Sequence, residues 1–141
     1  MNLWVEKYRP QSLEEYVGNE MIKNKISDYL SQGSIQNLLL HGVAGTGKTT
    51  LAKLIANNLN CDLLYINASD ERGIDTIREK IIPFASSMGF GDIKIVILDE
   101  ADYITPQAQA TLRNTMESFS GNTRFILTCN YLERIISPLQ S

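Results

Sequence analysis

The sequence predicts an α/β fold in which a parallel sheet lies between two layers of helices. Short apolar runs alternate along the chain with segments whose apolar residues recur at helical spacing. A length of 141 residues, with 43% hydrophobic and 21% charged residues, is also typical of one folded globular domain. Because strands separated by crossover helices must run parallel, a ligand site is expected at the carboxyl ends of the strands.

The predicted elements follow one another in order from residue 19. Apolar residues at helical spacing define a first helix that ends near Gly33, and a short buried strand then precedes a glycine-rich turn. Helical stripes and strand runs alternate after that turn. The predicted strands are 38–40, 63–66, 93–98 and 124–128, and the predicted helices are 19–33, 51–59, 74–88 and 106–119.

Two prolines refine these boundaries. Pro83 lies in the middle of the third predicted helix, and we expect it to end or kink that helix, because proline lacks an amide proton and its ring meets the carbonyl four residues earlier. Thr105 and Pro106 form a favourable N-cap and first-turn pair for the helix 106–119.

Charge and composition exclude several classes of function. Lysine and arginine number 13 against 16 aspartate and glutamate, a formal charge of −3, which argues against a polybasic binder. No apolar run approaches the ~20 residues of a membrane span, and residues 1–10 are charged, so we expect no membrane partner and a cytoplasmic location. The lone His41 leaves no histidine cluster for a metal or a catalytic triad, and Cys61 and Cys129 are expected to be free thiols.

The glycine-rich turn fits the P-loop pattern, GxxxxGK followed by Ser or Thr, without a mismatch. Its glycines allow backbone N–H groups to surround a phosphate, and the helix that follows directs its positive end to the same place. Lys48 would add a positive charge, and Thr49 would bind Mg²⁺. A plain strand-to-helix turn also needs glycines but has no use for this Lys and Thr. The predicted nucleotide-binding residues are Gly42, Val43, Ala44, Gly45, Thr46, Gly47, Lys48, Thr49 and Thr50.

The strand 93–98 delivers two carboxylates to its carboxyl end and is typical of a Walker B strand. Asp99 would bind Mg²⁺ directly or through water, and Glu100 would be the catalytic base for the attacking water. Alone, a strand that ends in Asp-Glu is more often ordinary surface, and the string 99–102 also spells the label of a helicase family. Asn130, after the last strand, could reach a γ-phosphate, although an Asn at a strand end is usually a turn residue.

These motifs belong to a resemblance that spans nearly the whole chain. The sequence resembles the replication factor C family of clamp-loader small subunits from archaea, eukaryotes and tailed phages, which are AAA+ ATPases. The segments that carry it are 5–10 (VEKYRP), 42–49 (the P-loop), 67–74 (NASDERGI), 99–102 (DEAD), 108–117 (AQATLRNTME) and 128–130 (TCN). The resemblance implies an AAA+ ATPase domain over residues 1–141 that uses ATP and Mg²⁺.

The resemblance also implies partners. In this family five ATPase subunits form an open ring, which uses ATP to open a sliding clamp and releases it on primer–template DNA without sequence specificity. Asn130 matches the family's sensor 1 residue, which acts with Lys48 and Glu100 in catalysis, and Arg72 matches a position that links DNA contact to the catalytic Glu. The implied adenine-pocket residues are Tyr8, Arg9, Pro10, Val17 and Gly18, and the implied DNA-backbone contacts are Ile74, Arg78 and Lys80.

Two segments also have simpler interpretations. Glu71, Asp75 and Glu79 interleave with the cations of the implied DNA segment, so a solvated helix face explains that segment equally well. Arg113 and Glu117, four residues apart on a predicted helix, are expected to form an ordinary surface pair.

The sequence ends at Ser141, before the Arg that continues this stretch in the family and serves there as an arginine finger. The family's fifth strand, lid and collar are also absent from these residues. In the family strand order 5-1-4-3-2 this leaves the strand 38–40 as an open edge, so we expect self-association or marginal stability. Without the arginine finger and the lid we also expect little ATP turnover. The alternatives are another AAA+ machine, such as a helicase motor or a replication initiator, and a ring subunit that does not hydrolyse ATP.

Overall fold

The structure is a computed structural model that describes residues 37–41, 47–57, 59–71 and 73–140. Several predicted features lie outside these residues. They are the helix 19–33, the adenine-pocket residues Tyr8, Arg9, Pro10, Val17 and Gly18, the P-loop residues 42–46, and Arg72.

The described residues form a four-stranded parallel sheet with the strand order β1-β4-β3-β2. The strands are β1 (Leu38–His41), β2 (Cys61–Asn67), β3 (Ile93–Asp99) and β4 (Thr123–Cys129). Each strand matches its predicted range to within two residues at either end. The predicted neighbour order 1-4-3-2 is confirmed, with β1 and β2 at the edges of the described sheet.

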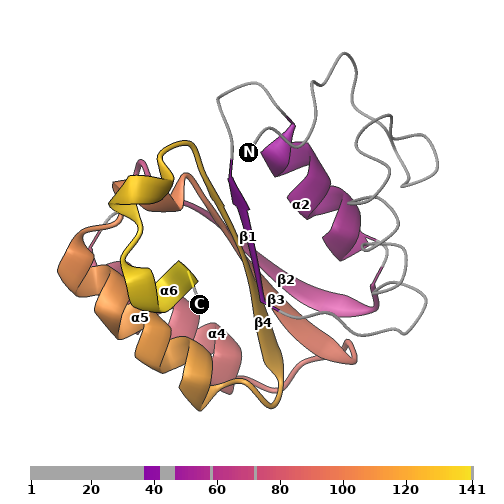
Figure 1. Ribbon diagram of the computed structural model, residues 1–141. Helices are drawn as coiled ribbons and strands as arrows, with labels where there is room; N and C mark the ends of the chain where they lie inside the picture. Colours follow the sequence, from indigo (N-terminus) through magenta and orange to yellow (C-terminus); the bar gives the residue numbers. More distant parts are fainter. Residues whose placement is uncertain (1–36, 42–46, 58, 72, 141) are drawn as a thin grey trace.

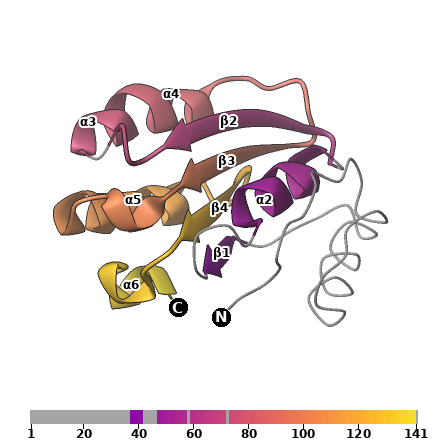
Figure 2. The same ribbon diagram turned by 90° about the horizontal axis from the view of Figure 1, so that it is seen from above.

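Helices cover both faces of this sheet, so the fold has the three predicted layers (Figure 1). On one face lies α2 (Lys48–Asn57), and on the other lie α4 (Ile82–Ser86), α5 (Pro106–Ser118) and α6 (Ser137–Gln140), as the view from above confirms (Figure 2). Within the described ranges, none of the helices has the length and apolar character needed to cross a membrane.

The residues of β3 explain why both faces are covered. Ile95 and Ile97 pack with α2, whereas Val96 and Leu98 point to the opposite face and pack beneath the other helices. All four side chains are fully buried. A strand that is apolar on both faces is typical of parallel sheets in α/β proteins.

The expected break at Pro83 takes the form of a π turn. The helical stretch consists of α3 (Ile74–Thr76), the π turn η2 (Ile77–Ile81) and α4, and Pro83 lies in the first turn of α4. In a regular α-helix the ring of Pro83 would clash with the carbonyl group four residues earlier. The π turn widens the helix at that point and so relieves the clash. The stretch ends at Ser86, where the buried Lys94 ammonium donates to the carbonyls of Ala85 and Ser87.

The start of α5 is formed as predicted. Thr105 is the N-cap residue, its hydroxyl accepts a hydrogen bond from the N–H of Ala108, and Pro106 is the first helical residue.

The buried Gln109 connects this first turn of α5 to the segment that follows β4. Its side-chain nitrogen donates to the carbonyls of Ile104 and Arg134, at 2.9 Å in each case. Its side-chain oxygen accepts from the N–H of Ile136 at 2.8 Å. One side chain thus provides hydrogen-bond partners for two backbone carbonyls and one backbone N–H, and it joins the start of α5 to the segment after β4.

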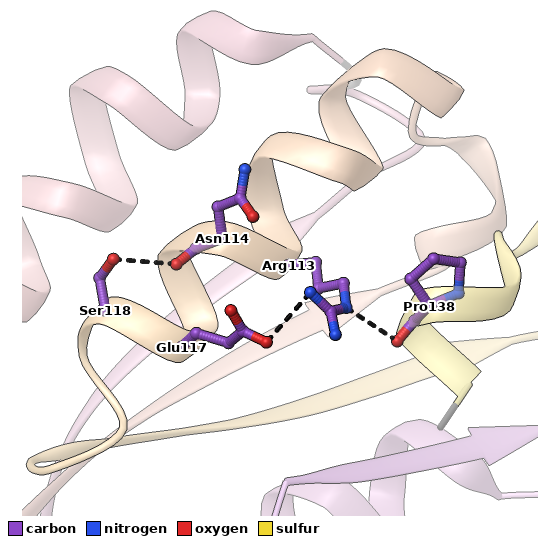
Figure 3. A network of polar contacts seen from close by, with 5 residues as sticks. All are labelled: Arg113, Asn114, Glu117, Ser118 and Pro138. Atoms are coloured by element: carbon purple, nitrogen blue, oxygen red, sulfur yellow. Dashed lines mark hydrogen bonds and ion pairs between the residues drawn. The ribbon is translucent and has the colours of Figure 1, made fainter.

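Arg113 and Glu117 form the predicted surface pair on α5, with 3.0 Å between Nη1 and Oε1 (Figure 3). Arg113 Nε also donates to the carbonyl oxygen of Pro138 at 3.3 Å, which joins α5 to α6 (Figure 3). Both side chains are exposed, so the ion pair contributes little to stability.

Candidate active site

The predicted catalytic motifs meet at one edge of the sheet. Lys48 and Thr49 begin α2 in the connection that follows β1, Asp99 ends β3 with Glu100 next to it, and Asn130 follows β4. Because β4 lies between β1 and β3, the three motifs occupy neighbouring positions along the carboxyl ends of the strands.

The first turn of α2 fits a phosphate-binding role. Gly47 has a φ of 83°, a left-handed conformation that glycine adopts without steric cost. Lys48 and Thr50 are both buried in this turn. Burial lowers the pKa of the Lys48 ammonium group, although nearby acidic groups act in the opposite direction. A buried cation of this kind favours an anionic partner.

Three hydroxyl groups from three elements donate hydrogen bonds to the buried carboxylate of Asp99. Thr49 Oγ1, from α2, lies 2.8 Å from Oδ1, and Thr128 Oγ1, from β4, donates to the same oxygen. Tyr65 Oη, from β2, lies 2.6 Å from Oδ2. Together, Thr49, Tyr65 and Thr128 form a hydroxyl cluster. It satisfies both carboxylate oxygens and fixes the orientation of Asp99 relative to α2.

Tyr65 also contacts α2 through its ring. The Nζ atom of Lys53 lies 4.8 Å from the ring centroid, a cation–π contact. Burial and the hydrogen bond to Asp99 raise the pKa of Tyr65 well above its usual range. The phenol therefore stays protonated and acts as the donor toward the carboxylate.

Glu100 has a left-handed backbone, with φ 55° and ψ 48°, and is the one non-glycine residue with a positive φ in the part of the chain that the structure describes. Its N–H donates to Thr128 Oγ1 at 3.0 Å, so one hydroxyl binds both Asp99 and the backbone of Glu100. This conformation ends β3 and starts the short turn η3 (Ala101–Tyr103). Strained residues of this kind concentrate at functional sites.

Asp102, in η3, connects the turn after β3 to Asn130. Its Oδ2 accepts hydrogen bonds from the N–H groups of Asn130, at 3.3 Å, and Tyr131, at 3.1 Å. Its buried Oδ1 has no hydrogen-bond partner among the residues that the structure describes. The backbone of Asn130 is therefore anchored to the turn that follows Glu100.

The donor set beside α2 suits Mg²⁺. Thr49 and Asp99 offer hydroxyl and carboxylate oxygens, the hard ligands that this ion prefers, and phosphate oxygens usually supply much of its remaining coordination. Across the described ranges, no group of three or more His, Cys, Asp or Glu side chains could hold a metal ion on its own.

The predicted DNA-contact segment follows β2 at the same edge of the sheet. Arg78 is exposed on η2, and Lys80, also exposed, forms an ion pair with Glu71. Ile74 is half-buried and packs against the core. The ion pair with Glu71 thus neutralises part of the positive charge of this segment.

Tyr65, Thr128 and Asp102 also belong to the site, although no sequence motif indicates an individual role for any of them. A polar residue in an otherwise apolar strand, as in LLYIN and FILTCN, is the signal that could have found the two hydroxyl groups. Asp102 has no comparable signal, because its partners are backbone N–H groups after another strand.

A three-layer fold with a phosphate-binding helix and a Walker B strand joined at one edge defines a P-loop NTPase. A family model described as the ATPase family associated with various cellular activities (AAA) matches residues 38–141. The chain belongs to this AAA family, and it is a nucleotide-binding domain.

The predicted resemblance to the replication factor C family is confirmed. The Replication factor C small subunits of Natronomonas pharaonis and Thermofilum pendens are each 50% identical to this chain, over 99% of the chain and 45% of their own length. The chain thus spans less than half the length of these relatives. A solved structure, the RuvB Holliday junction branch migration motor of Thermotoga maritima, is 26% identical with a TM-score of 0.72, covering 94% of this chain and 45% of that one.

Proposed function

We propose that this chain binds and hydrolyses ATP within a DNA sliding-clamp loader, in which ATP drives opening of the clamp and its release on primed DNA. The observation that carries the proposal is the 50% identity to replication factor C small subunits over 99% of the chain. The hydrogen bond from Thr49 to Asp99 supports it, because it joins the two motifs that phosphoryl transfer requires.

The residues of the site divide the chemistry among them. Lys48 binds the terminal phosphates as a point charge, and the backbone N–H groups of the P-loop surround them. Glu100 accepts a proton from the attacking water, whose oxygen bonds to the γ-phosphorus as the bond to the β,γ-bridging oxygen breaks and ADP leaves. Asn130 orients the γ-phosphate or this water.

Thr49 and Asp99 are the residues that would hold Mg²⁺, which when bound neutralises negative charge on the phosphate oxygens. The hydroxyl proton of Thr49 is directed at Asp99, so the lone pairs of Thr49 Oγ1 are left for a metal. The two residues therefore act as one unit, with the carboxylate orienting the hydroxyl.

A branch-migration motor and a subunit that does not hydrolyse ATP are the alternatives. The RuvB match is 26% identical, roughly half the identity of the replication factor C relatives, and so favours a shared fold over a shared substrate. Lys48, Asp99 and Glu100 are all present, which argues against an inactive subunit. A replication role would place the protein with the DNA, in the cytoplasm of an archaeal or phage-infected cell and in the nucleus of a eukaryote.

The turn between α4 and β3 offers a surface for the clamp. Met88 and Phe90 are 96% and 101% exposed, and such large exposed apolar side chains often mark a contact surface. Asp62 holds this turn in place, because its Oδ2 accepts from the N–H groups of Phe90 and Gly91, at 2.9 and 3.3 Å. Changing Met88 and Phe90 together to Ser should lower stimulation of ATP turnover by the clamp and leave nucleotide binding unchanged.

DNA is the second proposed partner, bound through its backbone by the segment that contains Arg72, Ile74, Arg78 and Lys80. Because Lys80 pairs with Glu71, Arg78 is the stronger candidate for a phosphate contact. Contacts of this kind are salt-sensitive and carry no base specificity, as loading at any primer junction requires.

ATP turnover in the presence of clamp and DNA tests this function. We expect the chain, assembled with its partner subunits, to hydrolyse ATP faster when a sliding clamp and primed DNA are both present. Stimulation by a four-way DNA junction and not by the clamp would support the branch-migration alternative. Rapid turnover that responds to neither would contradict the proposal.

A further inference from the structure

We infer that Tyr65 is a positioning residue for the Mg²⁺ site, because its hydroxyl holds the Asp99 carboxylate in the orientation that serves the metal beside Thr49. The inference rests on the proposed function and names a further residue of the same site. Tyr65 belongs to neither the P-loop nor the Walker B motif, and it lies on β2, the edge strand next to β3.

The two oxygens of Asp99 have different partners. Oδ1 accepts from the hydroxyls of Thr49 and Thr128, and Oδ2 accepts from Tyr65 at 2.6 Å. No other donor to Oδ2 is found within the described ranges. Because a buried carboxylate oxygen without a donor is costly, loss of the phenol would allow the carboxylate to turn until Oδ2 regains one. That rotation would also disturb Oδ1, the oxygen that contacts Thr49.

Tyr65 supports the metal site from outside and does not compete for it. The phenol binds Oδ2, whereas Oδ1 accepts from Thr49 and Thr128, so the phenol does not occupy the carboxylate oxygen next to Thr49. Groups that hydrogen-bond a metal ligand in this way orient it, and their removal typically lowers metal affinity by about 10–100-fold. If Tyr65 instead competed with Mg²⁺ for Asp99, the metal could bind only after the phenol had released the carboxylate. Removing the phenol would then raise the affinity for Mg²⁺.

The tyrosine is itself held in a fixed position. β2 pairs with β3 along its whole length, and Tyr65 lies opposite Ile97, two residues before Asp99. On its other side the ring contacts Lys53 of α2. The hydroxyl is therefore fixed between α2 and the end of β3, as a positioning group requires.

The variant Tyr65→Phe tests the inference, because it removes the hydroxyl and keeps the ring against Lys53. The readout is the factor by which excess Mg²⁺ tightens binding of a fluorescent ATP analogue, relative to binding in excess EDTA. We expect this factor to fall about tenfold in Tyr65→Phe. Affinity in EDTA should stay as in the wild type, and the variant should still melt cooperatively, which separates lost positioning from lost folding.

Tyr131→Phe is the matched control. Tyr131 is also partly exposed, but its ring lies over Arg134 and not over Lys53 of α2. We therefore expect Mg²⁺ to tighten binding of the analogue by the same factor in this variant as in the wild type. An unchanged or larger factor in Tyr65→Phe would overturn the inference and leave the proposed function standing. A wild-type chain that binds the analogue equally well with and without Mg²⁺ would overturn the inference alone, and one that does not bind the analogue at all would overturn both.

Discussion

The left-handed backbone of Glu100 costs about 1–2 kcal/mol, because the Cβ atom of such a residue approaches the following carbonyl oxygen. The hydrogen bond from Glu100 N–H to Thr128, and that from Thr128 to Asp99, hold the residue in this conformation. These hydrogen bonds thus offset the strain and fix the backbone of the proposed base beside the proposed metal ligand.

Replacing Glu100 by Gln should stop hydrolysis without preventing nucleotide binding. The amide cannot accept a proton from water, so we expect the rate of ATP hydrolysis to fall by about 10²–10⁴-fold. Phosphate release in the presence of clamp and primed DNA measures the rate, and a fluorescent analogue measures binding. Glu117→Gln, on the exposed side of α5, is the control and should hydrolyse ATP normally. Equal rates in Glu100→Gln and the wild type would show that this carboxylate is not the base.

The thiol of Cys129, next to Asn130, should be unreactive at neutral pH. Burial, with a smaller effect from the charge of Asp102, raises its pKa from 9.0 to about 11. Because the thiolate is the reactive form, its fraction near pH 8 falls about 100-fold, and the alkylation rate should rise about tenfold per pH unit up to the raised pKa. Peptide mass spectrometry after iodoacetamide treatment measures this rate, with urea-unfolded protein as the reference. A native rate equal to the unfolded rate would contradict the buried position.

At the residue scale, the sequence predicts those site residues that belong to contiguous motifs. Lys48, Thr49 and Asp99 are identifiable because their neighbours in the chain complete the P-loop and Walker B patterns. The strand pattern LLYIN marks Tyr65 only as a polar residue, because its contact with Asp99 depends on the pairing register of two strands separated by a helical stretch. Register is a property of the folded sheet, so no local pattern encodes that contact.

At the element scale, Gln109 attaches α5 to the segment that follows β4, through hydrogen bonds to Arg134 and Ile136. We expect Gln109→Leu to destabilise the fold by about 3 kcal/mol, because two carbonyls and one N–H would lose their partners in a buried place. Urea unfolding followed by circular dichroism measures the change.

Gln107→Leu is the control for this experiment, since Gln107 lies two residues earlier on the exposed side of α5. It makes the same substitution without removing a buried hydrogen bond, and its free energy of unfolding should stay close to that of the wild type. Equal destabilisation by the two variants would mean that the three hydrogen bonds of Gln109 do not contribute to stability.

The elements themselves were predictable to different degrees. Strands such as β3 stand out because they are apolar on both faces, and α5 is marked by the cap residues Thr105 and Pro106. The π turn ahead of Pro83 could not be predicted, because the sequence indicates an obstacle to an α-helix there but not how the chain avoids it. The short turns η3 and η4 (Leu132–Arg134) likewise lack a periodic pattern.

At the scale of the whole molecule, the two ends of the sheet have different proposed partners. The nucleotide site occupies the carboxyl ends of the strands, whereas the exposed Met88 and Phe90 lie in the turn that leads into the amino end of β3. The intervening strand β3 is buried along nearly its whole length. Under the proposed function, this buried strand would connect the nucleotide site with a clamp bound at the opposite end.

The edge strand β1 should cause self-association of this chain. Within the described sheet it pairs only with β4. A groove of about 470 Å³ between β1, α5 and α6 has a mixed lining, with Leu38, Leu39 and Leu139 beside polar residues such as Arg113 and Glu117. Unpaired strand edges with apolar neighbours recruit other chains. Sedimentation velocity should therefore show a weight-average mass that rises with protein concentration. A monodisperse monomer across the accessible range would contradict this prediction.

Calorimetric titration of ATP into the chain, with and without Mg²⁺, tests the central claim most directly. We predict one ATP site whose affinity is raised by Mg²⁺, and a loss of about 10–100-fold in affinity in Lys48→Ala, because a charge-assisted contact with phosphate is removed. A wild-type chain that does not bind ATP, or a Lys48→Ala variant that binds it equally well, would contradict the account.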